Sequence, residues 1–121
     1  MLPPTHRHHY HEFLTALEQL HHTAEKTANL QSDLLIADFQ EVQQIFTRPV
    51  ENLTGDEANA DLGSRMQSYL TEIDRLMRLL QMDIMFLQAA RNPATVQQRL
   101  SATRDRIKNL IGFAEAILQQ Q

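Results

Sequence analysis

The chain has 121 residues, and its eleven lysines and arginines against fifteen aspartates and glutamates give a net charge of −4 at pH 7. It contains no cysteine, which excludes disulfides, thiolate metal sites and cysteine nucleophiles. The length is typical of one domain, so we expect residues 1–121 to form a single helical domain. Only three glycines and four prolines are present, a composition that favours helices.

The charge is distributed unevenly along the chain. Residues 1–62 contain ten acidic and three basic groups, a net −7, whereas residues 63–121 contain five acidic and eight basic groups, a net +3. Such a split can pair the two halves within one monomer, which is the simpler interpretation, or align two copies head to tail. Acidic residues such as Asp74 and Asp83 are interleaved with the basic ones, so the pattern argues against nucleic-acid binding.

The N-terminus and the most apolar stretch bear on localisation. Residues 1–8 are polar where the apolar core of a signal peptide would have to lie. Polar residues including Arg78 and Asp83 interrupt the apolar stretch 76–90, whereas a membrane span needs roughly 20 mostly apolar residues. We therefore expect a soluble, cytoplasmic protein without a membrane partner.

The first half of the chain predicts two amphipathic helices. Thr5, a residue type suited to capping, precedes apolar residues spaced by three and four, which predict a helix over about residues 6–28. A second helix is expected to start at the capping pair Ser32-Asp33 and to end before Pro49, because a proline drives its predecessor towards extended geometry. The two stripes comprise Tyr10, Phe13, Leu14, Leu17, Leu20 and Ala24, then Leu35, Phe39, Val42, Ile45 and Phe46.

The second half of the chain predicts a longer helical hairpin. After a loop at residues 47–58, a three-four rhythm of apolar residues continues from Leu62 to Ala90, which corresponds to roughly 45–50 Å of helix. Asn92-Pro93 ends this helix and starts the next, since asparagine caps helices and proline suits the first helical position. The last helix is expected to continue close to the C-terminus.

Together these segments predict an all-α fold, an antiparallel four-helix bundle in which two shorter N-terminal helices precede a long C-terminal helical hairpin. Because the helices of the hairpin are longer than the two helices before them, part of the hairpin's apolar surface is expected to remain unpacked within one molecule. Uncovered apolar surface on a soluble protein is typical of an interface. The candidate protein-binding residues flank the hairpin's main stripes and are Met77, Arg78, Met82, Met85, Phe86, Arg99 and Arg106.

The methionines among these residues have two interpretations. Core filling is the simpler one, because methionine packs readily into irregular interiors. A groove for a partner is the other, because the same flexible thioethers adapt to varied partner surfaces. Met82 and Met85 are the better interface candidates, since they flank the main apolar stripe rather than lie on it.

No constellation of residues predicts catalysis. The three glycines are scattered, so no phosphate-binding loop is expected. All six histidines lie within the first 22 residues, and His8 and His11 can share a helix face with Glu12, but a stable metal site normally needs a third or fourth ligand. Glu18 and His21 have the spacing of a di-iron bundle motif without the second copy such sites require. We expect no enzymatic activity, no cofactor and no bound metal.

The residue pattern leaves three function classes open. The leading hypothesis is an adaptor or regulator that binds a protein partner through the long hairpin. The main alternative is a small metal- or ligand-binding helical bundle that uses the N-terminal histidines. A structural homodimer without another partner is the third class.

Several short segments, mainly in the first half of the chain, carry a resemblance to a known family. They are Met1-Leu2-Pro3, Tyr10-His11-Glu12-Phe13, Leu17-Glu18-Gln19-Leu20 and Phe39-Gln40-Glu41-Val42-Gln43-Gln44. In these segments and in overall length, the sequence resembles the PatD family of cyanobacterial heterocyst frequency control proteins. The resemblance implies a non-enzymatic developmental regulator that limits how many cells of a filament become heterocysts. The family's connection to the division protein FtsZ implies FtsZ as a partner and its assembly as the regulated process.

Overall fold

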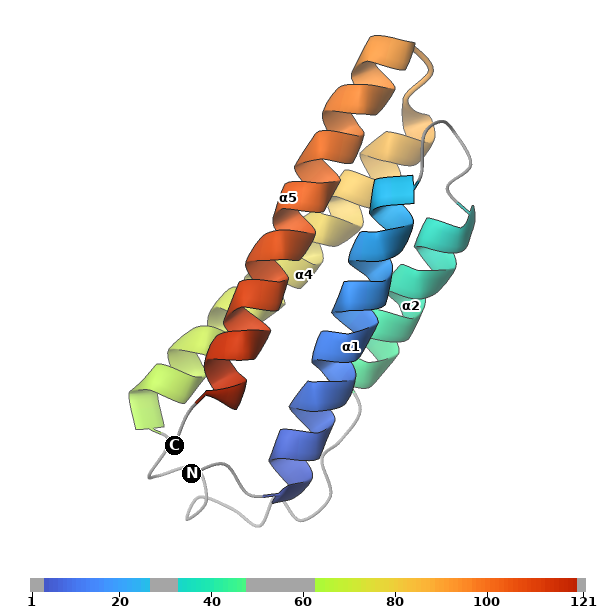
Figure 1. Ribbon diagram of the computed structural model, residues 1–121. Helices are drawn as coiled ribbons and strands as arrows, with labels where there is room; N and C mark the ends of the chain where they lie inside the picture. The colour runs from blue at the N-terminus through green and yellow to red at the C-terminus, as the bar shows by residue number, and fades with distance from the viewer. Residues whose placement is uncertain (1–3, 27–32, 48–62, 120–121) are drawn as a thin grey trace.

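The computed structural model describes residues 4–26, 33–47 and 63–119, which form four helices and contain no strand (Figure 1). The helices, labelled as in Figure 1, are α1 (Pro4–Lys26), α2 (Asp33–Thr47), α4 (Gly63–Ala89) and α5 (Pro93–Leu118). The prediction of an all-α fold is therefore confirmed for the described residues. Within these ranges, no helix is long and apolar enough to cross a membrane.

The four helices lie side by side and alternate in direction along the chain (Figure 1). Close packing joins α1 to α2, α1 to α5 and α4 to α5. The helices α1 and α2 contain 23 and 15 residues, whereas α4 and α5 contain 27 and 26. The turn between α4 and α5 consequently projects beyond the end of α1 and the start of α2, at the top of Figure 1.

The apolar stripes of all four helices meet in one core. Burial raises the pKa of the Tyr10 hydroxyl at the edge of this core, because the phenolate form would be poorly solvated there. A fully buried leucine, isoleucine or phenylalanine contributes about 1.5–3 kcal/mol relative to an exposed one. The largest fully buried side chains are Phe13, Leu17, Leu20, Leu35, Val42, Ile73, Leu80, Leu87, Leu100, Ile107, Leu110 and Ile117.

Two polar contacts fix the C-terminal end of α1 to its neighbours. The Arg104 Nε of α5 donates a hydrogen bond of 2.9 Å to the Ala24 carbonyl, which satisfies one of the carbonyls that a helix end leaves without an intrahelical donor. The Thr23 hydroxyl donates to the Asp38 carboxylate of α2. The last turn of α1 is thus tied to both α5 and α2.

The helix boundaries test the capping predictions. The prediction of Thr5 as a cap is wrong, because α1 begins at Pro4 and Thr5 lies within the helix. Thr47, expected in a loop, is the last residue of α2, while the rest of that predicted loop and the Ser32 cap lie outside the described residues. Asn92 does cap α5: its extended backbone has φ −81° and ψ 130°, and its side-chain oxygen accepts a 2.8 Å hydrogen bond from the Ala94 amide.

Removing the Asn92 cap should destabilise the protein. Asn92→Ala leaves the Ala94 amide without its side-chain acceptor, and we expect the free energy of unfolding to fall by about 0.5–2 kcal/mol. Urea unfolding followed by circular dichroism measures the change. Asn92→Ser is the matched control, because serine caps helices nearly as well. Equal midpoints for the alanine and native proteins would show that the cap contributes nothing.

The interior of α5 offers a stabilising substitution at Gly112. This residue is exposed, and a Cβ added to it would meet no atom within 4 Å. Since glycine costs about 0.5–1 kcal/mol relative to alanine inside a helix, Gly112→Ala should raise the free energy of unfolding by that amount. Thermal unfolding followed by circular dichroism measures the change. Ser101→Ala, at another exposed position of α5, should raise the unfolding temperature by less in the same assay. A lower unfolding temperature for Gly112→Ala would contradict the open space seen at this position.

Candidate protein-binding surface

Three large apolar side chains are exposed in the last part of α4. Met82, Met85 and Phe86 have 48%, 59% and 45% of their surface accessible to solvent. Their spacing of three and four residues places them on one side of the helix. Single exposed apolar residues are ordinary, but a contiguous group on one face is typical of a binding surface.

The next helix adds a cation to this group. The guanidinium carbon of Arg99 in α5 lies 4.7 Å from the ring centroid of Phe86 in α4. A cation–π contact at an exposed site stabilises by about 0.5–1 kcal/mol, and it restricts both side chains. Because these four residues lie together near the projecting turn, we call Met82, Met85, Phe86 and Arg99 the hairpin patch.

The electrostatic surroundings of the hairpin patch are positive. Residues 84–104 contain three arginines and no aspartate or glutamate. One of these, Arg91, is exposed in the turn between α4 and α5, and Arg104 makes the contact with α1 described above. The acidic residue that directly precedes this stretch, Asp83, is buried. The hairpin patch therefore combines apolar side chains with the positive charge of Arg99, and Arg91 is exposed in the adjoining turn.

An ion pair beneath the patch joins α4 to α5. The Arg106 Nε lies 2.9 Å from the Asp83 Oδ2, and the two side chains are only 28% and 10% exposed. A charge-assisted hydrogen bond of this length is stronger than a neutral one. It also neutralises the carboxylate, which would be costly to bury without a partner. The pair thus fixes the register of the hairpin close to the patch.

The structure separates the seven predicted binding residues into two groups. Met82, Met85, Phe86 and Arg99 are brought together in the hairpin patch. The remaining three residues make other contacts. Met77 is 6% exposed and packs in the core. Arg78 forms an exposed ion pair with Asp74 in its own helix, and Arg106 forms an ion pair with Asp83.

The position of Met77 corrects its expected place on the surface. Met77 is four residues from Ile73 and three from Leu80, both fully buried. These spacings turn its side chain to the same face of α4, so it fills the core. Met82 and Met85 are offset from this face and remain exposed. The core interpretation is therefore right for Met77 and wrong for Met82 and Met85.

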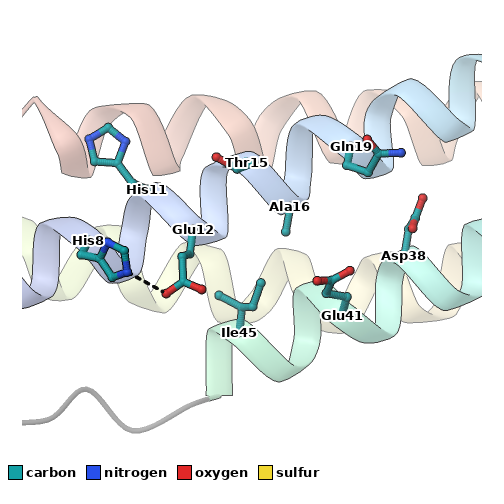
Figure 2. Close-up of a pocket in the computed structure, with 9 residues that line it drawn as sticks. All are labelled: His8, His11, Glu12, Thr15, Ala16, Gln19, Asp38, Glu41 and Ile45. Atoms are coloured by element: carbon teal, nitrogen blue, oxygen red, sulfur yellow. Dashed lines mark ion pairs between the residues drawn. The ribbon is translucent and has the colours of Figure 1, made fainter.

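A groove between α1 and α2 was not predicted from the sequence. Its volume is about 510 Å³, and Figure 2 shows Glu12 and Ala16 of α1 facing Asp38, Glu41 and Ile45 of α2 across it. Both helices place these residues at spacings of three and four, the only sequence signal that could have revealed the groove. Its described lining is His8, His11, Glu12, Thr15, Ala16, Gln19, Asp38, Glu41 and Ile45, and we call it the α1–α2 groove.

The N-terminal histidines take several different positions. His8 Nε2 lies 3.3 Å from Glu12 Oε1 at the edge of the α1–α2 groove (Figure 2), and His21 Nδ1 lies 3.5 Å from Glu25. His6 and His9 are instead buried. Among the described residues, no three or more histidine, aspartate or glutamate side chains are placed to hold a metal ion together.

The contribution of the buried ion pair can be measured against an exposed one. Asp83→Ala leaves Arg106 without its partner in a half-buried position, and we expect the free energy of unfolding to fall by about 1–3 kcal/mol. Asp74→Ala, which breaks the exposed pair with Arg78, should cost at most about 1 kcal/mol. Chemical denaturation of both variants, together with Arg106→Ala and the Asp83→Ala/Arg106→Ala double variant, gives the coupling energy. Equal losses for Asp83→Ala and Asp74→Ala would show that burial adds nothing.

Comparison with known proteins places the chain in a family. A family model described as the CRR41 C-terminal domain matches residues 8–115, which include most of all four helices. No curated protein and no solved structure matches the sequence significantly. On the extent of the family match, the chain belongs to the CRR41 C-terminal domain family.

Proposed function

We propose that this chain is a non-enzymatic regulator that acts by binding another protein through the hairpin patch. The observation that carries the proposal is the exposure of Met82, Met85 and Phe86 on one side of α4, next to Arg99 of α5. The proposed architecture is an antiparallel four-helix bundle whose two shorter N-terminal helices support a long C-terminal hairpin. In this arrangement Ile84 and Leu87 of α4 face the core, and the patch lies on the side of α4 that remains exposed.

The composition of the hairpin patch suits a protein interface. Burying a large apolar side chain contributes about 1.5–3 kcal/mol, and three such side chains are available here. Methionine adapts its shape to the surface it meets, whereas aromatic residues and arginine are enriched among the residues that dominate binding energy. Phe86 and Arg99 already contact each other, so they would form a joint anchor at the centre of the interface.

The structure beneath the patch favours binding by reducing its entropic cost. The Asp83–Arg106 ion pair holds α4 and α5 together directly below it, and the Arg104 contact to the Ala24 carbonyl holds α5 against α1. A surface that is fixed before association loses less conformational freedom when it binds. We therefore infer a partner that docks onto an already formed hairpin.

The resemblance to the PatD family supports a biological setting for this binding. In that setting the protein is a cytoplasmic developmental regulator that controls heterocyst frequency in filamentous cyanobacteria, and FtsZ is the first candidate partner. Binding to FtsZ would couple the regulator to cell division by modulating FtsZ assembly. A homodimer is the other partnership that the proposal includes.

The proposal predicts that polar substitutions in the patch weaken binding without unfolding the protein. Met82→Ser/Met85→Ser removes apolar contact area from exposed positions, so helicity by circular dichroism should be unchanged. The dissociation constant for purified cyanobacterial FtsZ, measured by biolayer interferometry, should rise at least about tenfold. Gln67→Ser is the control, because Gln67 is exposed near the opposite end of α4.

Two outcomes would contradict parts of this proposal. Unchanged affinity of the double variant for FtsZ would show that the hairpin patch is not the binding surface. Failure of the unmodified protein to bind FtsZ at all would reject FtsZ as the partner. In that case, an equal effect of Gln67→Ser and Met82→Ser/Met85→Ser on any other captured partner would reject the patch as well.

A further inference from the structure

The α1–α2 groove is a second feature that the proposed function does not use. Its volume of about 510 Å³ is large enough for several side chains, and Ala16 and Ile45 give it an apolar part. Glu12 of α1 and Asp38 and Glu41 of α2 place three carboxylates around that apolar part (Figure 2). No lysine or arginine is found among the described residues that line it, so its charge is negative.

The groove and the hairpin patch are complementary in two respects. Both have an apolar centre, formed by Ala16 and Ile45 in the groove and by methionine and phenylalanine side chains in the patch. Their charges are opposite, since Arg99 belongs to the patch, Arg91 is exposed in the adjoining turn, and residues 84–104 contain no aspartate or glutamate. Complementary potentials of this kind accelerate encounter and determine which surfaces dock.

These two surfaces cannot meet within one molecule. The groove is lined by residues 8–19 of α1 and 38–45 of α2, which lie away from the α4–α5 turn. That turn projects past the opposite end of α1 (Figure 1). The contact therefore requires two molecules, and the occupant that the observations identify is a second copy of this chain.

We propose that the α1–α2 groove of one molecule receives the hairpin patch of a second copy, which aligns the copies head to tail. The inference rests on the proposed function only in taking the hairpin patch as a binding surface. In the complex, Met85 and Phe86 pack over the apolar part of the groove, and Arg91 and Arg99 face its carboxylates. Because the two surfaces differ, each copy retains one free groove or patch, and association continues into a short open chain.

The contact has a regulatory consequence for the partner-binding role. A hairpin patch inserted in the groove of another copy is unavailable to a different protein, so self-association and partner binding compete. The balance depends on protein concentration through mass action and on salt through screening of the exposed charges. Self-association would thus keep a reserve of the regulator inactive at high concentration.

A charge exchange between the two surfaces tests the proposal. The patch variant Arg91→Glu/Arg99→Glu and the groove variant Glu12→Lys/Glu41→Lys each place like charges on both surfaces, so each alone should remain at the monomer mass of 14.0 kDa. An equimolar mixture restores opposite charges at every contact and should associate. Sedimentation velocity over a concentration series measures the mass, and the unmodified protein should associate at about 0.05 M salt and dissociate at about 0.5 M.

Several results would overturn the proposal. A monomeric mass for the unmodified protein at every concentration and salt would reject it, as would a mixture of the two variants that fails to associate. Arg99→Lys keeps the positive charge, so this variant should still self-associate. A monomeric Arg99→Lys variant would reject the charge attraction as the basis of the contact. Circular dichroism of each variant confirms that helicity is preserved, and the mixing experiment itself requires folded partners to succeed.

The same variants separate this proposal from the proposed function. The groove variant should lose self-association and bind FtsZ at least as tightly as the unmodified protein, because its hairpin patch is intact and no longer occupied by another copy. If the unmodified protein is monomeric but Met82→Ser/Met85→Ser weakens FtsZ binding, self-association is wrong and partner binding stands. If the protein self-associates but FtsZ binding does not depend on the patch, self-association stands and partner binding through the patch is wrong.

Discussion

The packing of α1 between α2 and α5 is the contact on which the rest of the fold depends. The short helix α2 packs closely on α1, and α4 packs closely on α5, so the apolar stripe of α1 joins two helix pairs that otherwise have little close contact. Phe13, Leu17 and Leu20 of this stripe are fully buried. In the far part of α4 the same packing buries Ile84 and Leu87 and leaves the offset side of the helix, with Met85 and Phe86, in solvent. The exposure of the patch therefore follows from the side of α4 on which its residues lie, and it needs no special local structure.

Much of the fold follows from spacing and capping in the sequence. The stripe positions that were read from the three-four rhythm are mostly buried, and Asn92-Pro93 marks the start of α5 correctly because both residues act through local geometry. Thr5 shows the limit of such local signals, since α1 begins one residue earlier at Pro4. A capping residue type states only that a helix can start there. Pro4 is itself a residue type suited to the first helical position, so the sequence contains two neighbouring start signals.

Spacing along the sequence predicted the candidate surface only in part. Met82 and Met85 were predicted as interface candidates because they flank the main stripe of α4, and both are exposed. For Met77 the sequence left core filling and a partner groove open, and its side chain is buried in the core. The α1–α2 groove was missed. Its acidic lining comes from two helices, and Glu12 and Glu41 acquire a common environment only once α1 and α2 are known to be neighbours. Which helices are neighbours is a property of the topology, and it cannot be inferred from the periodicity within one helix.

The hydrogen bond from Arg104 to the Ala24 carbonyl spans 80 residues of sequence, and this has a consequence for how the protein is made. Of the four described helices α1 is synthesised first, and the side chain that bonds its last turn belongs to α5, which is synthesised after the other three. At ordinary rates of translation, roughly 4–16 seconds separate the two residues. Of the two described helices that pack closely on α1, only α2 is complete during that interval, and contacts between distant segments close more slowly than local ones. The nascent chain therefore exposes part of its future core until α5 emerges, so chaperone protection during translation would matter more for this protein than its small size suggests.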